Sequence, residues 1–400
     1  MEKYAYIKNF ERMGLGTFVH FGLYSIVGKG EWYLSLNRYA NKERYEKLPS
    51  VFKVKKGWAK EIVRTAKALG AKYITFTARH HDGFSLFDTQ GLSDYDSVHS
   101  ACGRDLAAEF VEECRKGGIV PFFYHTLLDW HHPDYRNDFP EYIDYLDKSI
   151  EILCRNYGKI GGFWFDGMWD KKDVDWQEDR IYGTIRKYQP EALIINNTGL
   201  SAMGKTGHKE IDSVTFERGK PSYVDRSEKP IAGEMCQILN DHWGYAANDC
   251  NYKSIKSLIE DLVDCRKYNC NFLLNVGLTA NGGVKKMDAA MLAEIGKWVK
   301  ANKNFIYNAH SADVTAENAD ILTDGEYYYA VVRNSFVGGD ENVTKSGESC
   351  IVKVNADICK ATWLDNGKRI RLKKNTFAAE PFEYGRSLAV RVARFQLKNQ

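Results

Sequence analysis

The sequence predicts an α/β protein in which a (β/α)8-like barrel is followed by a small antiparallel β-sandwich. About eight short apolar runs alternate with helical segments between residues 15 and 307, as expected of parallel strands joined by helical crossovers. No Gly-rich phosphate loop follows the first run, which favours a barrel over an open doubly wound sheet. After residue 307 the pattern changes to short β-rich runs separated by turn residues.

The barrel strands are expected to read as apolar at nearly every position, because such strands are buried on both faces. Segments of this kind occur at residues 16–20, 72–78, 119–125, 192–196, 213–217, 232–236 and 271–276, with a further strand ending at Asp166. Helices are expected at residues 57–69, 105–116, 140–156, 176–188, 253–268 and 287–301. The first of these helices has an apolar stripe and a glycine stop at Gly70, a common helix ending.

The final 90 or so residues are expected to form the sandwich. Its strands are predicted at residues 327–332, 350–354, 361–364, 369–372 and 388–392. A chain of 400 residues exceeds the usual size of one domain. We therefore predict two domains, residues 1–307 and 308–400.

The composition and charge of the chain indicate which kinds of partner and cellular compartment to expect. A net charge of +3 with dispersed lysines does not indicate a nucleic-acid or membrane partner. No run of about 18 apolar residues is present, so no membrane span is expected. The charged N-terminus shows no secretion signal, and the nine cysteines form no C-x-x-C pair. We expect a cytoplasmic protein with reduced thiols and no structural zinc.

Polar residues follow several predicted strands at the end where parallel barrels carry their active sites. Any one of them could be a satisfied structural residue, but their repetition at the same end of several strands favours a site. They are His20, the run Arg79-His-His-Asp82, Tyr124 with His125, Asp166, Glu217 and Glu234.

Asp166 ends the apolar run Phe163-Trp-Phe-Asp166 and precedes Gly167. An Asp-Gly pair often only closes a turn, so the local pattern leaves both interpretations open. Two carboxyl groups in an aromatic-lined pocket would suit glycoside hydrolysis, in which one group is ionised and the other protonated.

The order of several motifs resembles that of the α-L-fucosidases of glycoside hydrolase family 29. The resemblance implies a catalytic barrel with a C-terminal β-sandwich, no metal or other cofactor, and a retaining double displacement on a fucosylated oligosaccharide or glycoconjugate. The motifs are Phe18-Val-His-Phe-Gly22, Gly30-Glu-Trp-Tyr33, Thr77-Ala-Arg-His-His-Asp-Gly-Phe84, Asp94-Tyr-Asp-Ser-Val98, Asp129-Trp-His-His-Pro-Asp-Tyr135, Phe163-Trp-Phe-Asp-Gly167, Trp243-Gly-Tyr245 and Asn271-Phe-Leu-Leu-Asn-Val-Gly277.

The resemblance also implies roles for single residues. Asp166 falls on the nucleophile. Arg218 could supply a contact that relatives make with an arginine absent from Asn196-Asn-Thr198. The residues implied to hold or wall the fucose are His20, Glu31, Trp32, His80, His81, Tyr124, Trp164, Arg218 and Trp243.

Two glutamates compete for the acid/base role. Glu217 lies in the variable segment where the family's acid/base usually occurs, and we favour it because a general acid must reach the leaving oxygen. Glu234 is the alternative, and it could equally be a buried structural carboxylate. A retaining mechanism predicts a separation of about 5 to 5.5 Å between the two catalytic carboxyl groups.

Two other functions stay open at this point. In a metal-dependent barrel hydrolase, His20, His80, His81 and Asp166 would form a zinc shell; against this, consecutive extended residues point to opposite faces, so His80 and His81 would not reach one ion. A fucose-binding protein with little turnover would keep the pocket alone. Oligomeric state is not indicated by the sequence.

Overall fold

A closed barrel of eight parallel strands forms the centre of the computed structural model, which describes residues 4–37, 41–333, 349–382 and 388–398. Each strand pairs with the next in chain order, and β8 closes the barrel on β1. The predicted barrel is confirmed. Its strands are β1 Leu15–His20, β2 Tyr73–Arg79, β3 Val120–Thr126, β4 Gly162–Asp166, β5 Leu193–Asn196, β6 Ser213–Thr215, β7 Ala232–Gln237 and β8 Cys270–Gly277.

Six long helices surround the strands at the predicted places, within about two residues. Local chemistry sets their ends: the Asp105 carboxylate accepts a hydrogen bond from the N–H of Ala108 at the start of α6, and Gly70 ends α5 with a left-handed φ of 98°, which glycine tolerates. The helices are α5 Trp58–Leu69, α6 Leu106–Gly117, α8 Phe139–Asn156, α9 Glu178–Tyr188, α10 Ile255–Lys267 and α11 Lys286–Ala301.

Several helices were not expected from the sequence. The most consequential is α1 (Ala5–Met13), which closes the N-terminal end of the barrel: the Phe10 ring lies 5.2 Å from that of Tyr73 and 5.6 Å from that of Phe122. The others are too short to show a helical period. They are α2 Tyr24–Val27, α3 Tyr33–Leu36, α4 Lys42–Tyr45, η1 Leu48–Val51, α7 Asp134–Asn137, η2 Met168–Asp170 and α12 Lys303–Asn308.

Two antiparallel sheets follow the barrel, in the orders β10-β13-β15 and β14-β16-β12-β11-β9. The expected sandwich class is confirmed, but two strand predictions were wrong. Residues 369–372 form no strand, because Arg369 makes only an isolated bridge to Thr362. The last strand begins at Arg391, later than predicted. The division into domains at residue 307 stays a prediction. The strands are β9 His310–Ser311, β10 Ala316–Glu317, β11 Asp320–Thr323, β12 Tyr328–Val332, β13 Cys350–Val354, β14 Ile358–Trp363, β15 Thr376–Ala379 and β16 Arg391–Leu397.

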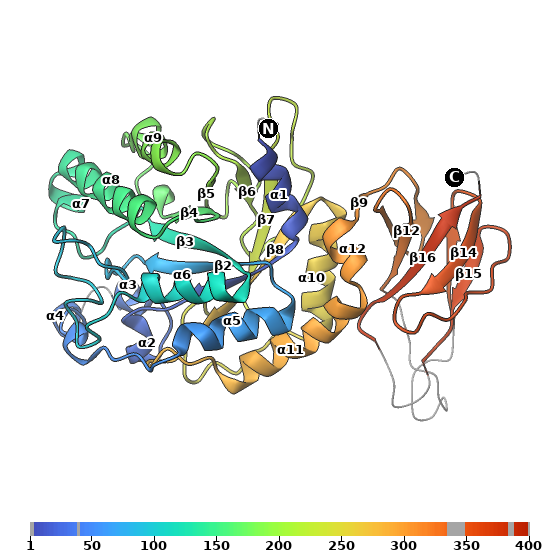
Figure 1. Ribbon diagram of the computed structural model, residues 1–400, viewed down its shortest axis with the longest axis horizontal. Helices are drawn as coiled ribbons and strands as arrows, with labels where there is room; N and C mark the ends of the chain where they lie inside the picture. The colour runs from blue at the N-terminus through green and yellow to red at the C-terminus, as the bar shows by residue number, and fades with distance from the viewer. Residues whose placement is uncertain (1–3, 38–40, 334–348, 383–387, 399–400) are drawn as a thin grey trace.

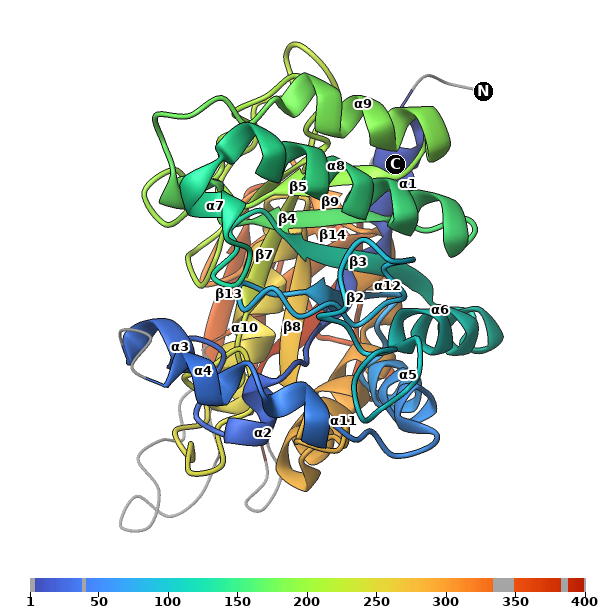
Figure 2. The ribbon, with the colours of Figure 1, turned by 90° about the vertical axis from the view of Figure 1, so that its left-hand side faces the viewer.

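The C-terminal sheets pack beside α10 and α11. The indole N–H of Trp298 donates to the carbonyl of Val390 at 2.8 Å, and Arg333 pairs with Asp264 at 2.6 Å. Figures 1 and 2 show that the sheets lie at one end of the barrel, while α2, α3 and α4 lie at the other. The loops that follow the barrel strands are therefore remote from the sheets.

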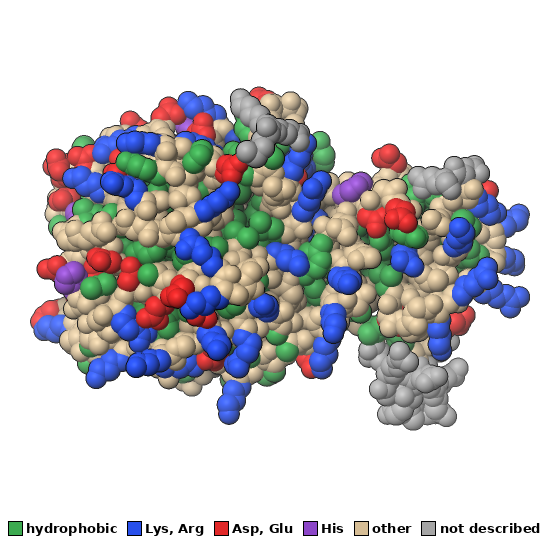
Figure 3. All heavy atoms as spheres, in the orientation of Figure 1, with side chains coloured by type: hydrophobic (Ala, Val, Ile, Leu, Met, Phe, Trp, Pro, Cys, Tyr) green, Lys and Arg blue, Asp and Glu red, His purple; other side chains and the backbone are tan. Residues whose placement is uncertain are grey.

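Charged side chains of both signs share the face of the barrel that Figure 3 displays, and the two signs are intermingled. None of the helices within the described ranges has the length and apolarity needed to cross a membrane.

Candidate active site

A cavity of about 650 Å³ opens at the C-terminal ends of the barrel strands. It contains Asp166, Glu217 and all nine residues expected to surround the sugar. No described residue beyond Trp243 lines it, so the C-terminal sheets do not contribute. Its lining consists of Phe18, His20, Glu31, Trp32, Leu36, His80, His81, Tyr124, Trp164, Asp166, Trp169, Lys172, Asn197, Gly199, Leu200, Ser201, Glu217, Arg218, Asp241, His242 and Trp243.

Asp166 ends β4 and receives hydrogen bonds on both carboxylate oxygens. Oδ1 accepts from the N–H of Gly167 at 2.9 Å, from the indole of Trp169 at 3.0 Å and from the amide of Asn197 at 3.2 Å. Oδ2 accepts from the hydroxyl of Tyr124 at 3.0 Å and lies 3.4 Å from Nε2 of His81. These donors hold the carboxylate in one orientation toward the cavity.

The same surroundings favour the ionised form of Asp166. Burial raises the pKa of this carboxyl group, but the hydrogen bond and charge of His81, with the bonds from Trp169 and Tyr124, outweigh it and lower the pKa below its ordinary value. Hydrogen bonds to the charged form stabilise that form. Asp166 is therefore a carboxylate at neutral pH.

Glu217 follows β6 after Phe216, and its surroundings favour the protonated form of its carboxyl group. Burial, followed by the negative charge of Asp166, raises the pKa of Glu217 to about 6. Two nearby carboxyl groups with pKa values pushed apart provide one base and one acid.

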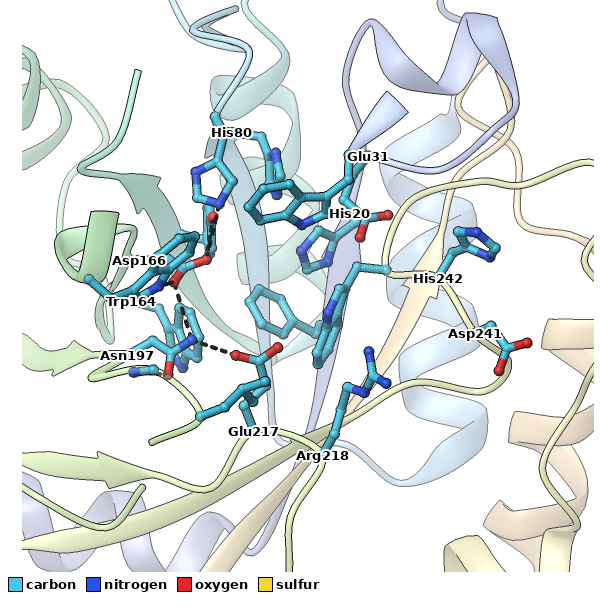
Figure 4. Close-up of a pocket in the computed structure, with 18 of the residues that line it drawn as sticks. His20, Glu31, His80, Trp164, Asp166, Asn197, Glu217, Arg218, Asp241 and His242 are labelled. Atoms are coloured by element: carbon cyan, nitrogen blue, oxygen red, sulfur yellow. Dashed lines mark hydrogen bonds and ion pairs between the residues drawn. The ribbon is translucent and has the colours of Figure 1, made fainter. Parts of the chain in front are cut away.

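A single side chain joins the two carboxyl groups. The Asn197 amide nitrogen lies 3.2 Å from Asp166 Oδ1 and 2.7 Å from Glu217 Oε2, as the dashed lines in Figure 4 show. These two oxygens are therefore at most about 6 Å apart, the sum of the two distances. The two catalytic carboxyl groups lie about 5 to 5.5 Å apart in retaining glycosidases and about 6.5 to 9.5 Å apart in inverting ones. The bound of about 6 Å is nearer to the retaining separation than to the middle of the inverting range.

Glu234 does not line the cavity, so its placement as the alternative acid/base is not supported by the geometry. Its side chain points into the barrel interior, where it accepts hydrogen bonds from the hydroxyl of Tyr73 and, at 2.9 Å, from the indole of Trp164. Burial raises the pKa of Glu234 to about 7. Glu234 thus orients Trp164, which lines the cavity, by a hydrogen bond from the barrel interior.

His20 is held as a neutral ring of defined tautomer. The Asn275 amide nitrogen donates to the carbonyl of Trp243 at 2.7 Å, so its oxygen, 2.7 Å from His20 Nδ1, accepts the proton on that nitrogen. Burial lowers the pKa of His20 to about 3. Because Nδ1 carries the proton, Nε2 can accept a hydrogen bond from a ligand.

His80 and His81 both line the cavity, with ring centroids 4.4 Å apart. The opposite-face argument assumed that both residues are extended, but β2 ends at Arg79 and the two histidines lie at the turn that follows, where the N–H of Gly83 donates to the carbonyl of His80 at 2.9 Å. Nδ1 of His81 is hydrogen-bonded to the hydroxyl of Thr126 at 2.7 Å. Burial lowers the pKa of His80 well below its usual value.

Three other residues of the predicted cluster lie outside the cavity. His125 alternates with Tyr124 along β3 and points outward, where Nε2 lies 2.8 Å from the hydroxyl of Ser149. Arg79 is buried behind the site, 3.8 Å from Asp129. Asp82 accepts a hydrogen bond from the hydroxyl of Tyr45 at 2.6 Å.

Aromatic rings wall much of the cavity. The rings of Trp32 and Trp169 are stacked with centroids 5.9 Å apart, and the Trp243 ring lies 5.4 Å from that of His20. Glu31 is buried at the edge, where its carboxylate accepts from the N–H of Gly244 at 2.7 Å, and burial raises its pKa. Rings of this kind present flat apolar faces.

Sequence reasoning missed several residues of the cavity. Asn197 follows directly after β5, so the pattern that drew attention to His20 and Asp166 would also have found it. Trp169 lies in the short helix η2, and Asp241 and His242 lie in a loop; the sequence does not reveal the path of either segment.

The histidines and Asp166 do not form a metal site of recognised geometry. Within the parts of the chain that the structure describes, no group of three or more His, Cys, Asp or Glu side chains is arranged to hold a metal ion. The candidate zinc shell of His20, His80, His81 and Asp166 is thus unsupported.

A closed parallel barrel with two carboxyl groups in one aromatic-walled cavity, their pKa values shifted in opposite directions, is typical of one class of protein, the glycoside hydrolases. The family model described as Alpha-L-fucosidase matches residues 1–304. The chain therefore belongs to the α-L-fucosidase family, and the expected resemblance is confirmed.

Known proteins agree with this assignment. The structure is similar to α-L-fucosidase isoenzyme 1 from Paenibacillus thiaminolyticus, with 30% identity, a TM-score of 0.85, and coverage of 98% of this chain and 99% of the other. A sequence relative is the α-L-fucosidase of Dictyostelium discoideum, 25% identical over 75% of this chain and 71% of its own. A third similar protein is a GH29 α-L-fucosidase from Bacteroides thetaiotaomicron, described as a trapped covalent intermediate with 2-fluoro-fucosyl fluoride; it is 22% identical with a TM-score of 0.81, covering 99% and 97% of the two chains.

Proposed function

We propose that this protein removes terminal α-L-fucosyl residues from glycans with retention of configuration, with Asp166 as nucleophile and Glu217 as acid/base. The observation that carries the proposal is the pair of carboxyl groups bridged by Asn197 and pushed toward opposite ionisation. That arrangement supports attack by one group and proton donation by the other.

In the first step, an Asp166 oxygen attacks the anomeric carbon of fucose. The bond from that carbon to the leaving oxygen breaks, and Glu217 transfers its proton to this oxygen. The products are the released glycan alcohol, a fucosyl ester of Asp166 and a Glu217 carboxylate. Oδ2 is the attacking atom, because Oδ1 already accepts three hydrogen bonds and Oδ2 accepts fewer.

In the second step, the Glu217 carboxylate takes a proton from a water molecule while the water oxygen attacks the same carbon. The ester bond to Asp166 breaks, and fucose leaves with its original anomeric configuration. Both residues return to their starting protonation. The two carboxyl groups supply both the nucleophile and the proton transfer.

Asn197 supports whichever carboxyl group carries the charge. Before the first step its amide donates to the Asp166 carboxylate, and after that step its bond to Glu217 becomes a bond to an anion, which is the stronger kind. The amide orientation is fixed because its oxygen accepts from the N–H of Gly199 at 3.2 Å. Asn197 is thus a positioning residue for both steps.

The remaining cavity residues hold the sugar. Nε2 of His20 accepts from a fucose hydroxyl, and His80 and His81 provide further ring nitrogens beside the nucleophile. Trp243, next to His20, gives an apolar face for the sugar's methyl group. A neutral imidazole offers one donor and one acceptor, which matches a hydroxyl group.

The test separates an enzyme from a fucose-binding protein. Asp166→Ala should lower kcat on an aryl α-L-fucoside on the order of 10³-fold or more, with fucose affinity retained. Glu217→Ala should regain activity with added azide and release an α-L-fucosyl azide, because azide takes the place of water in the second step and the configuration is retained. Glu326→Ala, an exposed glutamate of the C-terminal sheets, is the control. A loss below tenfold in Asp166→Ala would contradict the nucleophile assignment.

A further inference from the structure

We propose that the C-terminal sheets help to place the acid/base Glu217 through a chain of ion pairs, in which Lys220 is the positioning residue. The inference rests on the proposed function, because it concerns the group that donates the proton. The chain of ion pairs runs from Lys220, which follows Glu217 closely in the sequence, to a carboxylate on α10 and from there to Arg333, directly after β12.

The connection from β6 to β7 contains no helix. The two strands are parallel, so the connecting segment, residues 216–231, must return from the rim to the opposite end of the barrel. The structure describes every residue of this segment, and none of them is helical. A helical crossover is anchored by its apolar stripe. This connection has no such stripe, so single side chains must hold it in place.

Glu217 lies where the connection leaves the rim. The next residue, Arg218, donates its N–H to the carbonyl of Cys236 on β7 at 2.9 Å. Arg218 has a left-handed φ of 52°, which costs free energy for any residue other than glycine. A conformation of this kind persists because the surrounding structure imposes it. The turn after Glu217 therefore needs an anchor on its far side.

Lys220 supplies that anchor. Its ammonium nitrogen lies 2.8 Å from Oδ1 of Asp261 and 2.9 Å from Oδ2 of Asp264, both on α10. The other oxygen of Asp261 accepts a hydrogen bond at 3.2 Å from the amide of Gln237, the last residue of β7. The two carboxylate side chains are just 10% and 18% exposed, so salt screens these pairs less than it screens pairs on the open surface.

Asp264 joins the anchor to the C-terminal sheets. Its Oδ2 binds Lys220, and its Oδ1 accepts from the guanidinium of Arg333 at 2.6 Å. Arg333 also lies 2.8 Å from Asp320 of β11, whose second oxygen accepts from Lys267 at 2.6 Å. Figure 1 shows α10 between the barrel strands and these sheets. Positive and negative groups alternate along the whole chain of ion pairs, so each group favours the position of the next.

Release of this anchor should affect one of the two catalytic carboxyl groups. Figure 4 shows Arg218 beside Glu217, on the side away from Asp166. If the turn at Arg218 relaxes, Glu217 loses its alignment with the leaving oxygen, while Asp166 keeps its own donors on β3, β4 and β5. Proton donation should therefore weaken more than nucleophilic attack does. A leaving group that departs without a proton is insensitive to such a loss.

The test compares two fucosides that carry no second sugar. The dinitrophenolate of 2,4-dinitrophenyl α-L-fucoside leaves without a proton, whereas the alkoxide of methyl α-L-fucoside requires one. Lys220→Met should lower kcat/KM on the methyl fucoside on the order of fivefold. The same variant should change kcat/KM on the dinitrophenyl fucoside less than about twofold. Lys220→Arg, which keeps the charge, should restore the methyl fucoside rate.

The far end of the chain of ion pairs is tested by Arg333→Met, which should lower the same rate selectively. Lys220 and Arg333 act through one carboxylate, so the double variant should lose less than the product of the two single losses. Lys353→Met removes an ion pair with Glu317 within the C-terminal sheets. This control should leave both rates unchanged.

Three results would overturn the positioning role of Lys220: an equal loss on both substrates, no loss on either, or single losses that multiply in the double variant. A Lys220→Arg variant as impaired as Lys220→Met would do the same. Failure of the unmutated protein to hydrolyse the dinitrophenyl fucoside would instead overturn the proposed function. The dinitrophenyl rate also reports folding of each variant.

Discussion

Asp166 and Glu217 share one hydrogen-bond donor, the side-chain amide of Asn197, at 3.2 and 2.7 Å. The three residues follow or end three consecutive barrel strands, β4, β5 and β6. Because neighbouring parallel strands deliver their C-terminal ends to one rim, side chains far apart in the sequence meet there.

The pH dependence of kcat/KM follows from this pair. Turnover requires ionised Asp166 and protonated Glu217, so activity should fall as pH rises through about 6, the pKa of Glu217. The acid limb should lie below the ordinary range of a carboxyl group, because the pKa of Asp166 is lowered. A pH series on the free enzyme with an aryl α-L-fucoside measures both limbs. Full activity persisting at pH 9 would contradict the assignment of Glu217.

Asn197→Ala should move the basic limb of that profile to higher pH. The substitution removes a donor that stabilises the Glu217 carboxylate, so the pKa of Glu217 rises and the acid stays protonated longer. A drop in kcat with an unmoved limb would mean a merely structural role. Asn366→Ala, in a turn of the C-terminal sheets where the side-chain oxygen accepts from the N–H of Lys368, is the control.

Glu217 and Glu234 can be told apart by one substitution. Glu217→Gln should lose on the order of 10²-fold or more in kcat on substrates with poor leaving groups. Glu234→Gln should keep activity within about tenfold, because its amide can accept from Trp164 and donate to the Tyr73 oxygen, replacing both present bonds. A larger loss in Glu234→Gln than in Glu217→Gln would reverse the assignment.

Glu234→Gln should also change how stability depends on pH. The folded-state pKa of Glu234 is raised to about 7, so the folded protein binds more protons than the unfolded chain between the ordinary glutamate pKa and about 7. The free energy of unfolding therefore decreases as pH rises through that window, by up to roughly 3 kcal/mol. The variant should lose this part of the dependence. Denaturant titrations at pH 4.5 and 7.5 compare the two proteins, and an unchanged slope would be contrary to expectation.

Two helical glycines provide a packing test. A β-carbon on Gly296 of α11 would lie 1.8 Å from the carbonyl oxygen of Ala68, which belongs to α5, so Gly296→Ala should destabilise the protein by about 3 kcal/mol. Gly183 of α9 has nothing within 4 Å of the same position, so Gly183→Ala should stabilise by about 0.5–1 kcal/mol. Thermal unfolding of the two variants should shift in opposite directions.

The barrel was predictable because its strands are apolar at almost every position and each helix shows a stripe. The missed α1 buries Ile7 and Phe10 at a helical spacing but spans just nine residues, and its contacts with Tyr73 and Phe122 reveal its place. The C-terminal strands are short and alternate between buried and exposed residues, and the alternating segment Arg369-Ile-Arg-Leu372 was mistaken for one of them.

The site was predictable to the level of residues at strand ends, but not of the direction in which each side chain points. Tyr124 and His125 are neighbours, yet one faces the cavity and the other faces Ser149. Glu234 precedes the rim along β7 and so lies beneath the cavity. The bridge made by Asn197 depends on three strands at once, which no local pattern encodes.

Covalent labelling of the active site tests the assignment of Asp166 as nucleophile most directly. In a 2-deoxy-2-fluoro-fucosyl fluoride the 2-fluorine slows both steps while the fluoride leaving group speeds the first, so a covalent ester should accumulate, and mass spectrometry of a peptide digest locates it. We predict one fluorofucosyl adduct, on Asp166, and none in Asp166→Asn. An adduct on another residue, or rapid turnover that persists in Asp166→Asn, would contradict the mechanism.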